Sequence, residues 1–249
     1  MLRAYGDGTL FGEPYGDGPI HVVWLHGWGR RGRDFAVCAT NLADRGVASV
    51  TLDLPGFGAS PLPTVAGGAR HYATLLAGPL KDLSAGRLIL VGHSFGGRIA
   101  TVLAATHPEF VAGVVLTGAP LLRTGPSGAP PLQYRIIRAL HRRGMIGEQR
   151  MEAARQRFGS LDYRNATGVL RDVLVASVNE SYEDELAHIT VPVALVWGEH
   201  DTEVPVAVAE RAQNLIHSAH SLRVVASVGH LMPIEAPQEL VAEVEKLLG

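Results

Sequence analysis

The chain has 249 residues, of which 47% are hydrophobic and 18% are charged, and this composition excludes an intrinsically disordered chain and a coiled coil. A formal net charge of −2 excludes a protein that binds nucleic acid or membranes through a high overall positive charge. The one cysteine, Cys38, excludes a disulfide framework and a thiolate metal cluster, and the length fits one α/β domain with or without an insertion.

Short apolar runs alternate with helical patterns along most of the chain. Because most of these runs are apolar nearly throughout, we expect strands that are covered on both faces, as in a doubly wound parallel sheet. An antiparallel hairpin at the N-terminus would pair at one edge, and right-handed crossovers would carry the helices. In chain order we predict a hairpin over 2–15, strands over 21–25, 48–53, 88–91, 114–117, 193–197 and 222–225, and helices over 34–45, 69–80, 95–107, 206–217 and 235–248.

One segment interrupts the alternation of strand and helix. Residues 120–188 contain no convincing strand, and a start rich in proline and glycine is followed by arginine-rich helical sequence. We predict that residues 1–119 and 189–249 form an α/β core and that 120–188 form a helical lid. Such an insertion would lie over the carboxyl edge of the sheet, where open α/β sheets bind ligands.

The same segment carries most of the positive charge. From Arg123 to Arg171 there are ten arginines and three acidic residues, so this stretch carries +7 and the remainder of the chain −9. Such segregation would steer an anionic partner toward the site. An arginine-rich genome is the simpler explanation of the excess, since 20 of the 22 basic residues are arginine.

No targeting or membrane segment is recognisable. The first residues lack the basic start and apolar stretch of a secretory signal. The longest weakly polar run, residues 110–122, is interrupted by glycine and proline and is too short to span a bilayer. We therefore expect a cytoplasmic protein that binds neither membranes nor nucleic acid.

The pattern Gly92-His-Ser-Phe-Gly96 lies between a predicted strand and a predicted helix. This is the context that a G-x-S-x-G nucleophile elbow requires, because the chain turns so sharply that only small residues fit on both sides of the serine. The helix N-terminus below the turn favours negative charge on a bound substrate. Ser94 is therefore the candidate nucleophile.

A serine hydroxyl is a weak nucleophile at neutral pH and needs a base and an orienting acid. His230 follows the last predicted strand, Asp201 follows the preceding one, and the chain order Ser, Asp, His is the one that this type of elbow uses. Glu199 and His200 flank Asp201, but the fourth position of the G-x-x-D turn is the one that would reach His230. We predict a triad of Ser94, Asp201 and His230.

Acyl transfer also needs two backbone N–H donors for the oxyanion. Phe95, directly after the nucleophile, would supply one of them. The other would come from the loop after the 21–25 strand, where Gly27 lets the backbone approach and Trp28 would donate its N–H. His26 is expected to bind nearby loop backbone rather than act as a base.

These motifs together resemble the α/β-hydrolase superfamily over essentially the whole chain. The shared marks are HGWG at 26–29, DLPGFGAS at 53–60, GHSFGG at 92–97, WGEHD at 197–201 and GH at 229–230. The resemblance implies an eight-stranded, mostly parallel sheet, a helical lid after strand six, and the same triad.

The subfamily is left open by the motifs. A serine at position 94 argues against haloalkane dehalogenases, which need an aspartate there. HGWG with DLPGFG and an arginine-rich lid is similar to the esterases that cut pimeloyl-carrier-protein methyl ester, although those usually have tryptophan where His93 stands. In those esterases lid arginines hold an acidic carrier protein, and the corresponding candidates here are Arg135, Arg138, Arg142, Arg143 and Arg155.

Two further relatives share the triad. GHSFGGR resembles the menaquinone-pathway synthase of this fold, in which an arginine at the position of Arg98 binds a substrate carboxylate and the reaction is an elimination. A surface ion pair is the simpler role for Arg98. The carbon–carbon hydrolases of aromatic degradation usually have asparagine before the serine. The residues expected to line a substrate pocket are His93, Arg98, Arg123 and Leu231.

The sequence thus predicts a serine hydrolase that cleaves a carboxylic ester or thioester of a small or acyl-type substrate, free, anionic or carrier-bound, through an acyl-serine intermediate. Carbon–carbon hydrolysis or elimination on the same triad is the alternative reaction, and a ligand receptor with a vestigial triad is the non-enzymatic one. No cofactor or metal is expected, since the histidines lack ligand spacing. The oligomeric state is left open.

Overall fold

The computed structural model describes residues 1–123, 132–158 and 161–249. Its centre is an eight-stranded sheet with the strand order β1-β2-β4-β3-β5-β6-β7-β8. β2 pairs antiparallel with β1 and β4, and all the other neighbours are parallel, which confirms the predicted mostly parallel sheet. The strands are β1 (Arg3–Tyr5), β2 (Leu10–Tyr15), β3 (Ile20–Leu25), β4 (Ser49–Asp53), β5 (Ser84–His93), β6 (Val111–Thr117), β7 (Val193–Gly198) and β8 (His220–Val225).

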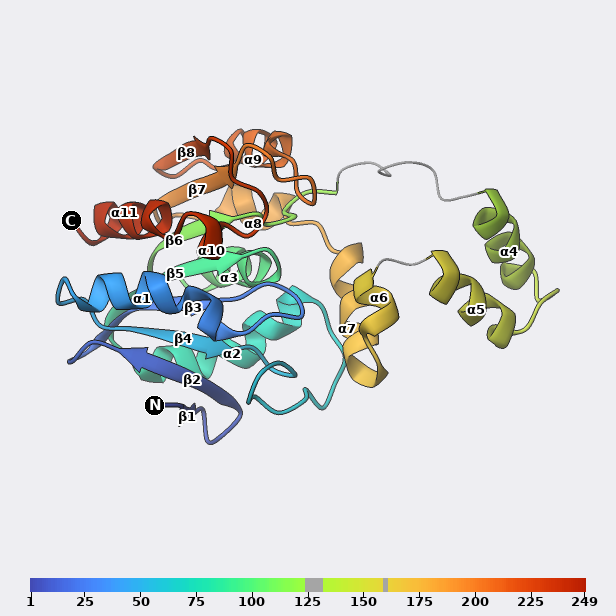
Figure 1. The fold of residues 1–249 in the computed structure, drawn as a ribbon, viewed down its shortest axis with the longest axis horizontal. Helices are drawn as coiled ribbons and strands as arrows, with labels where there is room; N and C mark the ends of the chain where they lie inside the picture. The colour runs from blue at the N-terminus through green and yellow to red at the C-terminus, as the bar shows by residue number, and fades with distance from the viewer. Residues whose placement is uncertain (124–131, 159–160) are drawn as a thin grey trace.

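Helices cover both faces of the sheet, so that two hydrophobic cores form (Figure 1). One core lies between the sheet and the helices α2, α3, α8 (Glu183–His188) and α9. The other lies between the opposite face of the sheet and the helices α1, α10 and α11. Every residue of β4 and β7 is buried, as expected of strands that are packed on both sides. The helices of the core are α1 (Ala36–Ala43), α2 (Ala69–Leu83), α3 (Phe95–Thr106), α9 (Val206–Gln213), α10 (Met232–Glu235) and α11 (Pro237–Leu248), with a 3-10 turn at Gly32–Phe35 before α1.

Several predicted boundaries differ from the observed ones for local reasons. The segment predicted as one helix over 235–248 contains the end of α10 and the whole of α11. The backbone of Ala236 is not helical, and Pro237, which has no N–H to donate, is the first residue of α11. The predicted helix 34–45 is a 3-10 turn followed by α1. The predicted helix 206–217 ends at Gln213, and the strand predicted at 88–91 extends over Ser84–His93.

Between β6 and β7 the described residues form five helices and no strand. Figure 1 shows α6 and α7 beside the sheet, whereas α4 and α5 stand away from it. The proline- and glycine-rich start of this segment, residues 125–131, lies outside the described residues. The helices are α4 (Leu132–Arg142), α5 (Glu148–Phe158), α6 (Leu161–Asn165), α7 (Gly168–Asn179) and α8 (Glu183–His188).

Strand register brings three loops to one edge of the sheet. Leu25 of β3 is opposite Gly92 of β5, and Gly92 is opposite Leu116 of β6. The segments that follow these three residues therefore meet at the carboxyl edge, where open parallel sheets bind ligands. Within the described parts of the chain, none of the helices has the length and apolar character needed to cross a membrane.

Candidate active site

Ser94 lies in a strained turn between β5 and α3. Its backbone has φ 49° and ψ −109°, a conformation that residues other than glycine rarely adopt. A Cβ atom on Gly96 would overlap the Leu25 carbonyl oxygen, and one on Gly92 would come within 2.5 Å of the Gly97 Cα. The close packing of these glycines explains why the sequence pattern forms this turn, which presents Ser94 at the carboxyl edge.

Asp201 and His230 form a hydrogen-bonded pair at the same edge. The His230 Nδ1–H donates to Asp201 Oδ2 over 2.9 Å. The other carboxylate oxygen of Asp201 accepts the backbone N–H groups of Glu203 at 3.0 Å and Val204 at 2.8 Å. Because both oxygens are engaged and Asp201 is buried, the carboxylate fixes the imidazole tautomer that leaves Nε2 directed at the cavity.

The electrostatic surroundings of His230 favour its protonated form. Burial by itself would lower the pKa of the imidazole, but the hydrogen bond and charge of Asp201, with the charges of Glu203 and Glu235, raise it overall. Glu235 also accepts the backbone N–H groups of Gly229 at 2.7 Å and Leu231 at 3.1 Å. The loop that carries His230 is thus held from both sides.

The loop after β6 supplies space rather than a catalytic acid. Gly118 has φ 54°, and a Cβ atom there would lie 2.9 Å from His230 Cε1 and 3.3 Å from Asp201 Oδ2. A side chain at this position would collide with the imidazole–carboxylate pair. Glycine at position 118 therefore lets β6 approach the pair directly.

The backbone N–H groups of Trp28 and Phe95 are available to an oxyanion. Among the described residues neither N–H has a hydrogen-bond partner. A Cβ atom on Gly27 would lie 3.3 Å from Ser94 Cβ, so the 26–29 loop closely approaches Ser94. The Trp28 ring packs edge-on against Phe95, with ring centroids 5.5 Å apart. These contacts hold both donors beside Ser94.

His26 has the structural contacts expected of it. Its Nδ1–H donates to the Gly27 carbonyl at 2.7 Å, and its Nε2 accepts the Leu54 N–H at 2.9 Å. Complete burial lowers the pKa of His26 to about 4, so the ring is neutral. His26 therefore joins the loop after β3 to the loop after β4.

His93 is buried against His230 at the wall of the larger cavity. It is 3% exposed, and its Nε2–H donates to the His230 carbonyl oxygen over 2.9 Å. The two imidazole centroids are 4.7 Å apart. Burial, together with the neighbouring charge of His230, lowers the pKa of His93 to about 3. A neutral His93 thus connects the nucleophile turn to the histidine loop.

Arg98 lines the smaller cavity near Ser94, and two of its nitrogens donate to backbone carbonyls. Nε donates to the Pro120 carbonyl at 3.1 Å and Nη1 to the Ser177 carbonyl at 2.7 Å. Arg98 thus joins α3 to the entry and exit of the inserted segment. This arrangement differs from the surface ion pair that the sequence suggested.

Two cavities, of about 180 and 220 Å³, adjoin at Ser94 and share four lining residues. Leu231 lines the larger one, and Arg123 is not among the lining residues of either. The shared residues are Trp28, Ser94, Asp162 and Glu203. His230 and His93 also line the larger cavity, and Arg98 the smaller one.

Sequence reasoning missed Asp162 and Glu203. Glu203 follows Asp201 by two residues at the end of β7, so its proximity to the site was available as a signal. Asp162 carried no such signal, because its place depends on how α6 packs over the sheet. Partial desolvation raises the pKa of the Asp162 carboxyl, and the charge of His230 opposes that shift.

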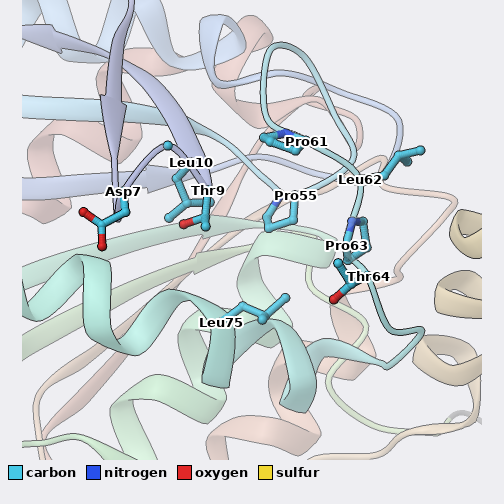
Figure 2. A pocket seen from close by; sticks show the side chains of 10 residues that line it. Asp7, Thr9, Leu10, Pro55, Pro61, Leu62, Pro63, Thr64 and Leu75 are labelled. Carbon is cyan, nitrogen blue, oxygen red and sulfur yellow. The ribbon is translucent and has the colours of Figure 1, made fainter.

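A larger cavity of about 290 Å³ lies elsewhere (Figure 2). Figure 2 shows Asp7 and Thr9 of the β1–β2 turn, the prolines of the loop after β4, and Leu75 of α2 around it. None of the three predicted catalytic residues lines this cavity. The nucleophile turn therefore belongs to the two smaller cavities.

Comparisons with known proteins agree with this architecture. Pimeloyl-[acyl-carrier protein] methyl ester esterase of Aeromonas hydrophila is 29% identical over 255 residues, covering 95% of this chain and 98% of that protein. The 2-hydroxy-6-oxononadienedioate/2-hydroxy-6-oxononatrienedioate hydrolase of Cupriavidus pinatubonensis is 28% identical over 224 residues, covering 79% of this chain and 75% of that protein.

A solved structure supports the same fold over the full length. An esterase from Exiguobacterium antarcticum, 24% identical, superposes with a TM-score of 0.75 and covers 100% of this chain and 99% of that chain. The model of the alpha/beta hydrolase family matches residues 22–244. The chain belongs to the alpha/beta hydrolase family.

Proposed function

We propose that this α/β-hydrolase is a serine hydrolase that cleaves a carboxylic ester or thioester of a small or acyl-type substrate. The family-level activity is ester hydrolysis, since relatives and structural neighbours are esterases. The observation that carries the proposal is the presence of the strained Ser94 and the Asp201-bound His230 in one cavity. This combination supplies a nucleophile and an oriented base.

The chemistry proceeds in two halves. The Ser94 hydroxyl attacks the carbonyl carbon while its proton passes to Nε2 of His230, and Asp201 stabilises the resulting imidazolium. The imidazolium then protonates the leaving alcohol or thiol as the acyl-serine forms. In the second half His230 accepts a proton from water, the hydroxide attacks the acyl-serine, and the proton returns to Ser94 as the acid leaves.

The oxyanion would bind to the N–H groups of Trp28 and Phe95. Both donors lack partners within the described residues and lie next to Ser94. Fixed donors of this kind stabilise the charge that develops only in the transition state. Loss of one such donor typically costs a factor of about 10²–10³ in kcat.

We also propose that the predicted lid, residues 120–188, divides into two functional parts. Asp162 of α6 and Leu174 of α7 line the cavities at Ser94, so these helices would cover the substrate. The lid arginines named above lie on α4 and α5 or directly after α4, and none of them lines either cavity. A carrier-bound acyl substrate, suggested by the name of the Aeromonas relative, would meet these arginines outside the reaction site.

Hydrolysis of p-nitrophenyl esters from acetyl to dodecanoyl tests the proposal. We expect turnover by the wild type and a fall in kcat on the order of 10⁶ for Ser94→Ala, by analogy with other triads. Ser221→Ala, at an exposed position of β8, is the matched control and should retain wild-type kcat. The chain-length profile would measure the depth of the pocket.

Near-normal turnover by Ser94→Ala would contradict the serine mechanism. Inactivity of the wild type on every ester would contradict ester hydrolysis and bring forward carbon–carbon hydrolysis, elimination or a receptor role. Cytoplasmic location stays a prediction of the sequence.

A further inference from the structure

We propose that Glu203 determines substrate specificity, by favouring esters with a cationic group near the scissile bond and disfavouring esters with a carboxylate there. The inference deepens the proposed function and rests on it. It departs from the anionic substrate that the overall charge pattern suggested, because the charge inside the cavity differs from the charge on the outer helices.

The position of Glu203 is set by the catalytic acid itself. Its backbone N–H donates to Asp201 Oδ1 at 3.0 Å, which fixes the turn after β7. From there its side chain reaches the reacting centre, with Oε2 3.5 Å from Nε2 of His230. Nε2 is the nitrogen that must exchange a proton with Ser94. The Glu203 carboxylate therefore lies next to the nitrogen that would accept the Ser94 proton.

Glu203 also lies at the junction of the two cavities that adjoin Ser94. It lines the 180 Å³ and the 220 Å³ cavities, as Ser94 does. Its side chain is 69% exposed, so it is hydrated and free to turn toward a bound group. An ester bound with its carbonyl at Ser94 would place one of its two substituents beside this carboxylate.

The arginines of the cavity walls do not balance this charge. The Arg30 guanidinium is paired with the Asp34 carboxylate at 2.5 Å. Arg98 donates to two backbone carbonyls. Asp162 adds a second carboxylate to the lining, and among the described residues no cation lies within ion-pair distance of it. Arg98 keeps its positive charge, but it stands alone against the two carboxylates Glu203 and Asp162, so a substrate carboxylate beside Glu203 would meet more negative than positive charge.

An aromatic side chain in the cavity lining adds to the preference. Trp28 lines both cavities together with Glu203, and its ring is held edge-on by Phe57 and Phe95, with centroids 5.1 and 5.5 Å away. An alkylammonium group is attracted to the face of an indole and to a carboxylate, whereas a neutral group of the same shape gains only the contact area. The two side chains together fit an organic cation.

Bound charge also changes the state of His230. The Glu203 carboxylate, 3.5 Å from Nε2, stabilises the imidazolium, which cannot act as a base. A substrate cation would compete for Glu203 and release its hold on Nε2. A substrate anion would be repelled by Glu203 and would itself stabilise the imidazolium. Both effects should therefore make hydrolysis of the cationic ester faster than hydrolysis of the anionic ester.

The test compares three thioesters that differ in charge at one position. These are butyrylthiocholine, its neutral isostere 3,3-dimethylbutyl thiobutyrate, and the anionic 2-sulfoethyl thiobutyrate, each assayed for kcat/KM at low salt. For the wild type we expect the cationic ester to exceed the neutral one by about fivefold, and the neutral one to exceed the anionic one similarly, as for a partly screened charge pair. High salt should reduce both ratios.

Three variants identify the residue responsible. Glu203→Gln should bring the ratio of cationic to neutral ester close to one, and Glu203→Lys should make the anionic ester the better substrate. Glu210→Gln on α9 makes the same change in net charge at an exposed position outside both cavities, and should keep the wild-type ratios. Wild-type ratios near one, or equal changes in the Glu203 and Glu210 variants, would overturn the proposal.

A binding measurement separates this inference from the proposed function. Phenyltrimethylammonium should bind the wild type about fivefold more tightly than Glu203→Gln, while the neutral isostere tert-butylbenzene should not distinguish them. If no ester is hydrolysed but this difference is found, ester hydrolysis fails and the cation preference stands. If esters are hydrolysed through Ser94 and neither probe depends on Glu203, only the cation preference fails.

Discussion

The carboxyl edge of the sheet and the α4–α5 pair are built in opposite ways. At the edge, Ser94, Asp201 and His230 stand on loops held by buried strands and by close glycine contacts. In α4 no residue is buried, and Figure 1 shows α4 and α5 standing away from the sheet. Under the proposed function, the sheet would position the catalytic residues, and the outer helices α4 and α5 would serve recognition.

The two regions also differ in charge. Asp162 and Glu203 face the cavities, and α4 carries Arg135, Arg138 and Arg142 on its exposed surface. A partner with negative charge would be attracted to the outer helices, but a negative group would be disfavoured at Ser94. The positive charge of the outer helices therefore does not predict which substrate charge is favoured at Ser94.

After the loss of Ser94 itself, the largest effect is expected from a change in the acid of the proposed triad. Asp201→Asn should lower kcat on ester substrates by about 10⁴, because an amide favours the wrong imidazole tautomer and does not stabilise the imidazolium. Asp172→Asn, at an exposed position of α7, is the matched control. Steady-state kinetics would measure both, and a loss of less than tenfold for Asp201→Asn would contradict the assigned pair.

Substitution of His93 tests whether its hydrogen bond to the His230 carbonyl helps to position the loop that carries His230. His93→Leu removes the donor to the His230 carbonyl and should lower kcat about 10- to 100-fold with little change in KM, since misplacement of a catalytic group by about 1 Å can cost about 100-fold. His93→Gln keeps a donor and should recover part of the loss. If Leu and Gln variants are equally active, the hydrogen bond has no positioning role.

The pH profile gives a smaller effect with a defined sign. His230 acts as a base only when neutral, so kcat/KM should rise as pH passes its pKa, which lies above the ordinary 6.5. The groups that face it are Asp201, Glu203, Glu235, Asp162 and neutral His93. Glu203→Gln removes a negative charge that stabilises the imidazolium, so the acid limb should move to lower pH.

Glu210→Gln provides the control for that profile. It should leave the acid limb of kcat/KM in place, since Glu210 lines neither cavity. A limb that moves equally in both variants would point to overall net charge rather than to Glu203. A limb that moves to higher pH in Glu203→Gln would contradict the stabilisation of the imidazolium by the Glu203 carboxylate.

The smallest effect is expected on the outer helices. The triple variant Arg135→Glu, Arg138→Glu and Arg142→Glu should change kcat/KM for a neutral p-nitrophenyl ester less than twofold, and each substitution should change stability by no more than about 0.5 kcal/mol. These side chains are exposed and line neither cavity. A tenfold loss on the neutral ester would show that α4 takes part in the reaction site.

What the sequence could predict follows the same division between sheet and insertion. Strands such as β3 and β7 are apolar runs ended by glycine or polar residues, and the glycines at 92 and 96 have a steric requirement that is local. The candidate triad could be proposed because each of its members follows a strand in the parallel part of the sheet. Local patterns and strand order therefore carried the prediction of the fold and of the candidate triad.

The features that the sequence did not predict depend on contacts between segments far apart in the chain. The bond from His93 to the His230 carbonyl and the bonds from Arg98 to Pro120 and Ser177 join residues far apart in the chain, and no periodicity reports them. The cavity position of Asp162 depends on how α6 packs. Boundaries shifted where one residue, such as Pro237, broke a helix that the apolar pattern continued.

The most direct test of the central claim is covalent labelling by a fluorophosphonate, followed by mass spectrometry of the peptides. The phosphonyl group should be found on Ser94, labelling should disappear in Ser94→Ala, and it should be slowed strongly in His230→Gln because the serine loses its base. A label on a different residue, or hydrolysis of esters by a protein that never takes the label at Ser94, would contradict the assignment of the nucleophile.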